Sequence, residues 1–132
     1  MCGIFGIVAD HHHNLDNTLI RHITDRLFRL SESRGKESAG IAIKHYSSQT
    51  ISVLKRSIPA SRFIRSRDYN QFFSSSLPQA EPLVGKDATA GGFAIIAHAR
   101  LVTNGSQETN QNNQPVIKDG CVVVHNGIVT NV

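Results

Sequence analysis

The chain has 132 residues, of which 39% are hydrophobic and 18% charged, and its formal net charge is +4. This length suits a single domain with a buried core, and the composition is ordinary for a soluble globular protein. No run approaches the roughly 20 apolar residues of a membrane-spanning helix, and no basic segment of the kind that opens a signal peptide begins the chain. We therefore expect a cytoplasmic protein that does not contact membranes.

The first predicted elements are a strand and a helix. Residues 3–9 are apolar and rich in β-branched side chains, which predicts a buried strand. Over residues 15–30, apolar side chains recur every three or four positions with arginine and aspartate between them, which predicts an amphipathic helix. Asn14 or Asp16 is the expected N-cap, and the helix should end by residues 33–35.

The remaining elements are mostly short strands. Residues 39–43 and 50–54 are predicted strands joined by a polar turn, and residues 60–76 are predicted to be partly helical. Residues 93–97 form another apolar run, and an Asp-Gly turn within 116–124 predicts a β-hairpin. Because helices and strands do not alternate strictly, this order favours a layered α+β sheet protein over a doubly wound fold.

The two cysteines have different surroundings. Without a secretory signal they do not predict a disulfide. Cys121 begins an apolar run, and we expect it to be buried and unreactive. Cys2 follows Met1, whose removal would make the cysteine N-terminal. Its α-amino group, with a reference pKa of about 7.7 to 8.0, could then accept the proton of its own thiol.

Two further segments place polar groups directly after apolar runs. Asn126 and Gly127 follow the last predicted strand, where a carboxamide and an approachable backbone N–H could form an oxyanion hole. A tight Asn-Gly turn is the alternative for this segment. Arg100 follows the 93–97 strand and could hold a carboxylate through paired hydrogen bonds, with hydroxyl and amide groups completing a pocket. A surface ion pair is the alternative there.

Together these segments resemble the class II glutamine amidotransferases, which belong to the N-terminal nucleophile hydrolases. Four ordered motifs carry the resemblance over almost the whole chain. Their spacing is most similar to that in the glutaminase domain of the glucosamine-6-phosphate synthases. The matching residues are Cys2-Gly3-Ile4 with Gly6, the run Arg34 to Gly40, His98-Ala99-Arg100 with Thr103 and Gly105, and His125 to Ile128 with Asn131.

The resemblance implies hydrolysis of the glutamine side-chain amide. Cys2 would attack the carboxamide, with its own α-amino group moving the proton, and a γ-glutamyl thioester would form as ammonia leaves. Water would then release glutamate. Asn126 and the Gly127 N–H would stabilise the developing oxyanion, and no metal or organic cofactor would be needed.

The resemblance also implies a clamp for the amino-acid part of glutamine. Arg100 would bind its α-carboxylate, with Thr103 and Asn104 beside it, although the family commonly has histidine where this chain has Asn104. Arg34 and Gly35 would shape the backbone around the N-terminus. In the same motif, glutamate replaces the family's usual aspartate at position 37 and preserves the charge.

The family fold is an αββα sandwich, and we expect this chain to hold an incomplete N-terminal portion of it. The aspartate that pairs with the glutamine α-amino group in the family lies in a later segment. An incomplete portion should leave a sheet edge and apolar surface uncovered. Ammonia would pass to a synthase domain outside this chain, with a sugar phosphate as one candidate acceptor, and the protein could form a homo-oligomer.

Several alternatives stay open. A stand-alone amidohydrolase of the same fold would act on another amide, and a non-catalytic glutamine-sensing module would keep the pocket without the chemistry. Three adjacent histidines at 11–13 cannot all face one metal from an extended segment, which favours an exposed loop. A basic cluster could bind phosphate or nucleic acid, but a solvated helix face or docking patch is favoured because no nucleic-acid motif accompanies it. This cluster comprises Lys55, Arg56, Arg62, Arg65 and Arg67.

Overall fold

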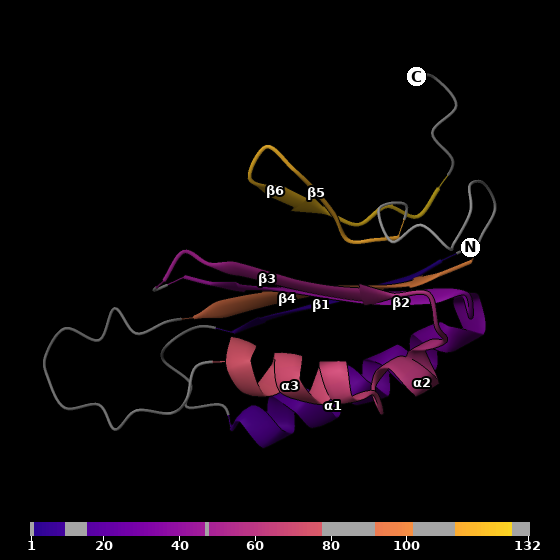
Figure 1. The fold of residues 1–132 in the computed structure, drawn as a ribbon, viewed down its shortest axis with the longest axis horizontal. Coiled ribbons are helices and arrows are strands. Elements are labelled where there is room, and N and C mark those ends of the chain that lie inside the picture. Colours follow the sequence, from indigo (N-terminus) through magenta and orange to yellow (C-terminus); the bar gives the residue numbers. More distant parts are fainter. Residues whose placement is uncertain (1, 10–15, 47, 78–91, 102–112, 128–132) are drawn as a thin grey trace, which may run out of the picture.

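A computed structural model describes residues 2–9, 16–46, 48–77, 92–101 and 113–127 (Figure 1). In chain order, the elements of these residues are β1 (Gly3–Ala9), α1 (Asn17–Ser31), a 3-10 turn η1 (Glu32–Arg34), β2 (Ser38–His45), β3 (Ile51–Arg56), α2 (Ala60–Phe63), α3 (Arg67–Ser76), β4 (Phe93–Arg100), β5 (Val116–Lys118) and β6 (Cys121–Val123).

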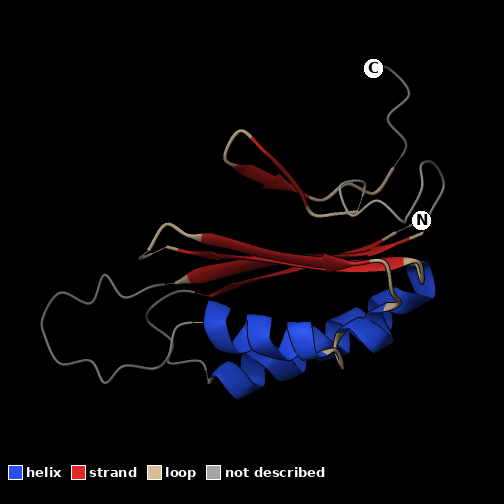
Figure 2. Cartoon of the chain, viewed as in Figure 1, coloured by secondary structure: helices blue, strands red, loops and turns tan. Residues whose placement is uncertain are grey.

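The main sheet is antiparallel, with its strands in the order β1-β4-β2-β3, and β5 and β6 form a separate hairpin. The helices cover one face of the main sheet, and the hairpin lies over the other face (Figure 2). Helices gathered on one side of an antiparallel sheet are typical of α+β proteins. The predicted α+β class is therefore confirmed.

The core lies between the main sheet and the helices. Alternate residues of β2 and β4, among them Ile41, Ile43 and Ile95, turn their side chains toward α1 and are buried. Phe28 of α1 lies at the centre, with its ring centroid 4.9 Å from that of Phe5 on β1. Three further rings, those of Phe63, Tyr69 and Phe73, extend this contact into α2 and α3.

The caps of the helices follow from the sequence. Of the two expected caps for α1, Asp16 is the one used, and its carboxylate accepts a hydrogen bond from the Thr18 N–H at 3.1 Å. In α3, the Ser66 hydroxyl accepts from the Tyr69 N–H at 3.2 Å. Each bond satisfies one of the backbone donors that a helix leaves unpaired in its first turn.

The hairpin is held against β2 and β3. Its turn residues Asp119 and Gly120 have φ angles of 50° and 75°, as the predicted Asp-Gly hairpin turn requires. Lys55 donates hydrogen bonds from Nζ to the carbonyls of Asn113 at 2.8 Å and Pro115 at 3.2 Å. A Cβ on Gly40 would lie 2.0 Å from the Gln114 carbonyl oxygen, so only glycine lets this segment approach the sheet so closely.

The expectation that Cys121 is buried was wrong. Cys121 is exposed, because β6 belongs to a short hairpin rather than to the interior of the main sheet. The five basic residues do not all lie on one surface. Lys55 faces the hairpin, whereas the Arg56 guanidinium donates through Nε to Asp68 at 3.0 Å on the helical side.

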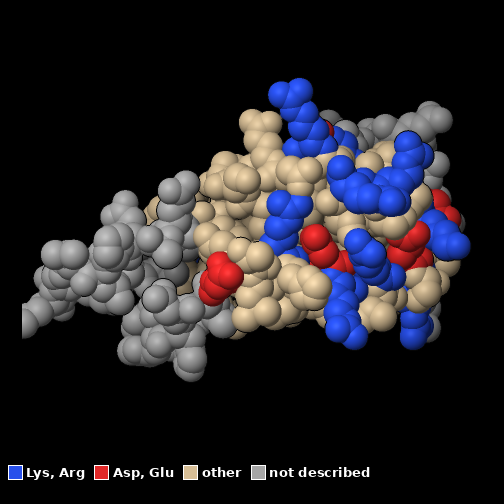
Figure 3. Space-filling view, turned by 90° about the horizontal axis from the view of Figure 1, so that it is seen from below, with Lys and Arg blue, Asp and Glu red and all other residues tan. Residues whose placement is uncertain are grey.

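The rest of the cluster is exposed on or beside the short helices, where basic side chains lie among carboxylates (Figure 3). This arrangement agrees with the solvated helix face that the sequence favoured. No helix in the described part of the chain is both long and apolar enough to span a membrane.

Candidate active site

Cys2 lies beside the end of β4. The pairing of Gly3 with Ala99 brings the start of β1 next to Arg100, the last residue of β4. The half-buried Cys2 thiol donates from Sγ to the Leu101 carbonyl at 3.7 Å. The residue expected to be the nucleophile is thus held beside the end of β4, with its side chain half-buried.

Cys2 and Asn126 are in direct contact. The Cys2 N–H donates a hydrogen bond to Asn126 Oδ1 at 2.9 Å, although the two residues are 124 positions apart. A carboxamide whose oxygen is used in this way presents its N–H₂ group as a donor for another oxygen. Gly127 follows directly, and a Cβ at this position would lie 2.8 Å from Cε1 of the His125 ring.

The segment that carries Asn126 is fixed by Gln114. The Gln114 side chain donates from Nε2 to the His125 carbonyl at 2.9 Å, and its Oε1 accepts from the His125 N–H. Gln114 in turn lies on Gly40 of β2, as described above. The sequence interpretation missed Gln114, and the only signal available was a polar residue directly before Pro115.

Arg100 is buried rather than on the surface, which excludes the surface alternative. It donates from a terminal nitrogen to Asn113 Oδ1 at 2.9 Å, and Asn113 donates from Nδ2 to the Ser57 hydroxyl at 3.0 Å. Asn113 itself is completely buried. These contacts fix the orientation of the Arg100 guanidinium. The sequence did not indicate that Asn113 would have this role.

Gly35 lies against the end of β4. A Cβ at this position would be 2.2 Å from the carbonyl carbon of Arg100 and 2.4 Å from the Leu101 nitrogen, so no larger residue fits. The Glu37 N–H donates to the Arg100 carbonyl at 3.2 Å. The 34–37 segment therefore supports the stretch of backbone that contacts Cys2, and the Arg34 side chain is exposed beside it.

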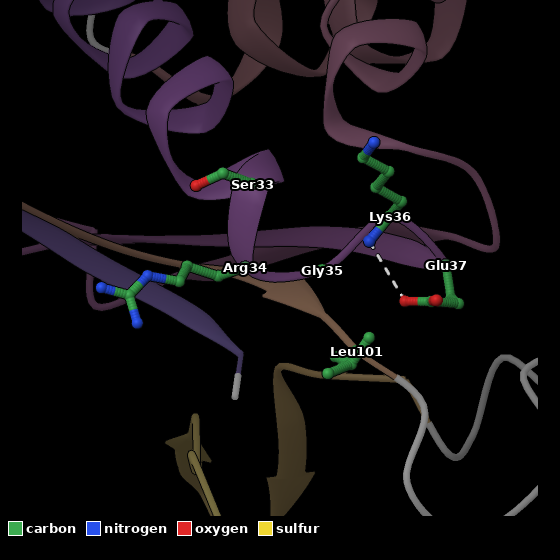
Figure 4. A pocket seen from close by; sticks show the side chains of 6 residues that line it. All are labelled: Ser33, Arg34, Gly35, Lys36, Glu37 and Leu101. Atoms are coloured by element: carbon green, nitrogen blue, oxygen red, sulfur yellow. Dashed lines mark hydrogen bonds between the residues drawn. The ribbon is translucent and has the colours of Figure 1, made fainter.

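A pocket of about 350 Å³ opens at this end of the sheet (Figure 4). The Arg34 and Lys36 side chains point away from each other, and the Lys36 N–H donates to the Glu37 carboxylate at 3.1 Å. The pocket is therefore lined by both basic and acidic side chains, and its positive charges do not converge on one point as they would in an anion-binding site. Its lining residues are Ser33, Arg34, Gly35, Lys36, Glu37 and Leu101.

His98 is a buried histidine that the family motif contains but that the sequence interpretation gave no role. Neither ring nitrogen has a hydrogen-bond partner among the described residues. Burial, together with the nearby charges of Arg100 and His125, lowers its pKa to about 4, although the His125 main chain acts in the opposite direction. The imidazole is therefore neutral near pH 7.

Part of the expected clamp cannot be placed. Thr103 and Asn104 lie outside the described residues, as do Asn131 and the histidines at 11–13. Within the described ranges, no three His, Cys, Asp or Glu side chains are grouped so that they could hold a metal ion.

Relatives of known name match the chain over nearly its whole length. Proteins named glutamine–fructose-6-phosphate aminotransferase (isomerizing) are 34% identical over 132 residues in Rhizobium meliloti, 33% over 132 in Neisseria meningitidis and 32% over 135 in Saccharomyces cerevisiae. Each match covers 99% of this chain. The resemblance to glutamine amidotransferases is confirmed. No family model and no solved structure matches the chain.

The glutamine amidotransferase relatives are much longer than this chain, which spans 17% of their length. Their names describe transfer of an amino group from glutamine to fructose 6-phosphate by the whole protein. The likeness agrees with the glutaminase-domain resemblance drawn from the cysteine, arginine and asparagine motifs.

Proposed function

We propose that this chain supplies the glutamine-hydrolysing chemistry of a class II glutamine amidotransferase, with Cys2 as its nucleophile once Met1 is removed. The observation that carries the proposal is the 2.9 Å hydrogen bond from the Cys2 N–H to Asn126 Oδ1. It joins the proposed nucleophile and the proposed oxyanion donor, two groups that this chemistry needs close together.

In the first half-reaction, the Cys2 thiol transfers its proton to the α-amino group, and the thiolate attacks the glutamine side-chain carbonyl carbon. The tetrahedral oxyanion accepts hydrogen bonds from Asn126 Nδ2 and the Gly127 N–H. One such donor is worth about 3 to 4 kcal/mol of transition-state stabilisation. The C–N bond then breaks, the α-ammonium returns a proton to the leaving nitrogen, and ammonia departs from a γ-glutamyl thioester.

In the second half-reaction, the α-amino group accepts a proton from water, and the resulting hydroxide attacks the thioester. The C–S bond breaks, the α-ammonium returns its proton to the Cys2 thiolate, and glutamate leaves. The same oxyanion donors serve both steps, because each passes through a tetrahedral intermediate at the same carbon.

Arg100 is the proposed anchor for the glutamine α-carboxylate. Its guanidinium is held by Asn113, which in turn bonds to Ser57, and an arginine oriented in this way can bind a carboxylate through two parallel hydrogen bonds. We place Thr103 and Asn104 beside the carboxylate by the family motif. Arg34 and Gly35 would support the backbone around Cys2.

The wider setting of the chain is also proposed. Helices on one face of a sheet and a hairpin over the other support the αββα sandwich of the N-terminal nucleophile hydrolases. Because the relatives are much longer, we propose that a synthase domain beyond this chain uses the ammonia. Fructose 6-phosphate, named for the relatives, is the proposed acceptor, and the proposed location is the cytoplasm.

The decisive experiment is intact mass spectrometry of the full-length protein, first untreated and then after incubation with the glutamine-mimicking electrophile diazo-oxo-norleucine. We expect a protein without Met1 that gains one adduct. Cys2→Ala should abolish the adduct, whereas Cys121→Ala, the matched control at the exposed second cysteine, should retain it.

Failure of a folded, Met1-free protein to form the adduct would overturn the assignment of Cys2. Glutamine binding without ammonia release would indicate the sensing module instead. Faster hydrolysis of other amides than of glutamine would indicate a stand-alone amidohydrolase.

A further inference from the structure

His98 is costly to the fold in its observed surroundings. Its side chain is 0% exposed, and both ring nitrogens lack a hydrogen-bond partner among the described residues. A buried polar group without a partner destabilises a fold, whereas an apolar ring of similar shape avoids that cost. The fold alone therefore gives no reason for a histidine here.

The position of His98 connects the strands that carry the site. In the sheet it pairs with Ile4 of β1 on one side and Gly40 of β2 on the other. Its side chain shares a face of β4 with Arg100, since side chains two positions apart on a strand point the same way. Gln114 covers the neighbouring Gly40 on this same face.

The ring lies near the main chain that precedes Asn126. Gln114 holds the His125 main chain by both its N–H and its carbonyl. The His125 main chain also lies close enough to the imidazole of His98 to favour its protonated form, but no contact of hydrogen-bond geometry joins them.

We propose that His98 is a positioning residue that supports the His125–Asn126 segment from the sheet side and so sets the Asn126 carboxamide against Cys2. The inference rests on the function proposed above. A neutral imidazole carries one donor and one acceptor, so it can bond to the main chain without bringing a second charge beside Arg100. Gln114 holds the same segment from the hairpin side, and the two contacts together would restrict its movement while the oxyanion forms.

The test compares His98→Phe with the wild type in the full-length protein, by ammonia release from glutamine and by thermal unfolding. We expect His98→Phe to be as stable as the wild type or more so, because the unbonded polar atoms are gone. We expect kcat to fall by about 10- to 100-fold with KM nearly unchanged, since small misplacements of catalytic groups have effects of this size.

A double-mutant cycle shows whether His98 acts through Asn126. If it does, His98→Phe should have little further effect on kcat in an Asn126→Ala background. His98→Gln keeps hydrogen-bonding ability and should retain more activity than His98→Phe. His98→Leu, which also lacks polar side-chain atoms, replaces the phenylalanine variant if that protein does not fold.

The matched control is His45, a second buried histidine of the same sheet, which lies at the end of β2 away from the proposed site. Its Nε2 bonds to the Ser76 carbonyl of α3. His45→Phe should lower the melting temperature and leave kcat unchanged. Wild-type kcat in a folded His98→Phe or His98→Leu protein would overturn the inference, as would an equal fold-loss with and without Asn126. A wild type without glutaminase activity would instead overturn the proposed function.

Discussion

The N–H of Cys2 donates a hydrogen bond to Oδ1 of Asn126 at 2.9 Å. This bond joins the residue directly before β1 to the segment that follows β6. The contact uses the oxygen of the carboxamide and leaves its nitrogen to act as a donor. One side chain can therefore orient the proposed α-amino base and stabilise the oxyanion, and these two roles can be separated by substitution.

Asn126→Asp separates them. Aspartate keeps an acceptor for the Cys2 N–H but places a negative charge where the oxyanion develops. We expect kcat for glutamine hydrolysis to fall by at least as much as in Asn126→Ala, for which loss of one oxyanion donor predicts about a 100- to 1,000-fold decrease. Ammonia release measures the rate. Both variants should keep the wild-type melting temperature, because Asn126 is exposed; wild-type kcat in the aspartate variant would argue against the oxyanion role.

Gly35→Ala should damage both stability and activity. The added Cβ would lie 2.2 Å from the carbonyl carbon of Arg100, so the backbone itself must move. Overpacking of this kind costs about 1 to 3 kcal/mol. Denaturant unfolding measures the loss, and ammonia release should fall because the moved backbone also carries the Leu101 carbonyl that contacts Cys2.

Gly6→Ala is the control, because its Cβ would lie 3.1 Å from the Ile95 carbonyl oxygen, a contact that small shifts can relieve. Its effect on stability and kcat should be the smaller of the two. An equal or larger effect would show that the 34–37 segment does not support the site in the way described.

The central ring of the core predicts a large effect on stability alone. Phe28 is 0% exposed and contacts rings from β1, α2 and α3, so Phe28→Ala should destabilise the protein by about 3 to 5 kcal/mol. Leu30→Ala on the same helix is the control, since this side chain is 66% exposed and its loss should change the free energy of unfolding little. Urea titration of the two variants measures the difference, and similar midpoints would contradict the observed packing.

The sequence predicted the local elements well because their signals are local. Apolar periodicity located α1, and an Asp-Gly pair located the hairpin turn, including the left-handed backbone at both turn residues. Cys121 was mispredicted because an apolar run does not reveal how many layers will cover it. Strand order was equally hidden, since placing β4 between β1 and β2 depends on contacts between distant segments.

The site was predicted only in part for the same reason. Family motifs indicated Cys2, Arg100 and Asn126, but the residues that orient them come from the 113–115 segment, which carries no motif. Asn113 and Gln114 act through side-chain hydrogen bonds between segments that are distant in the sequence, and no spacing rule predicts such bonds.

The buried His98 predicts a loss of stability in acid. Its pKa is about 4 in the folded protein against an ordinary value near 6.5, because burial and the charges of Arg100 and His125 disfavour protonation. Lys55 lies on the same face, two strands away, where its own pKa is lowered by burial. Between about pH 6.5 and pH 4 the unfolded chain binds a proton that the folded protein does not. Proton binding by His98 therefore has no effect on stability above this window and destabilises the folded protein increasingly as pH falls through it.

The loss attributable to His98 should reach about 3 kcal/mol at the acid end of this window. Urea unfolding of the wild type and His98→Phe at a series of pH values measures it, since the difference between the two removes the contribution of other titrating groups. We expect the wild type to lose stability relative to the variant as pH falls from 6.5 toward 4. A constant difference across the window would mean that His98 is protonated in the folded protein as readily as in the unfolded chain.

Removal of Met1 gives the last prediction, which concerns the proposed base. A free α-amino group titrates at about pH 7.7 to 8.0, and only its neutral form can accept the thiol proton. The rate of Cys2 alkylation by diazo-oxo-norleucine should therefore rise with pH through this range in the processed protein. A preparation that retains Met1 has an amide nitrogen at Cys2, which cannot accept a proton, so its alkylation should be slower and should lack the rise that the α-amino group causes. Equal rates and pH profiles for the two preparations would show that the α-amino group is not the base.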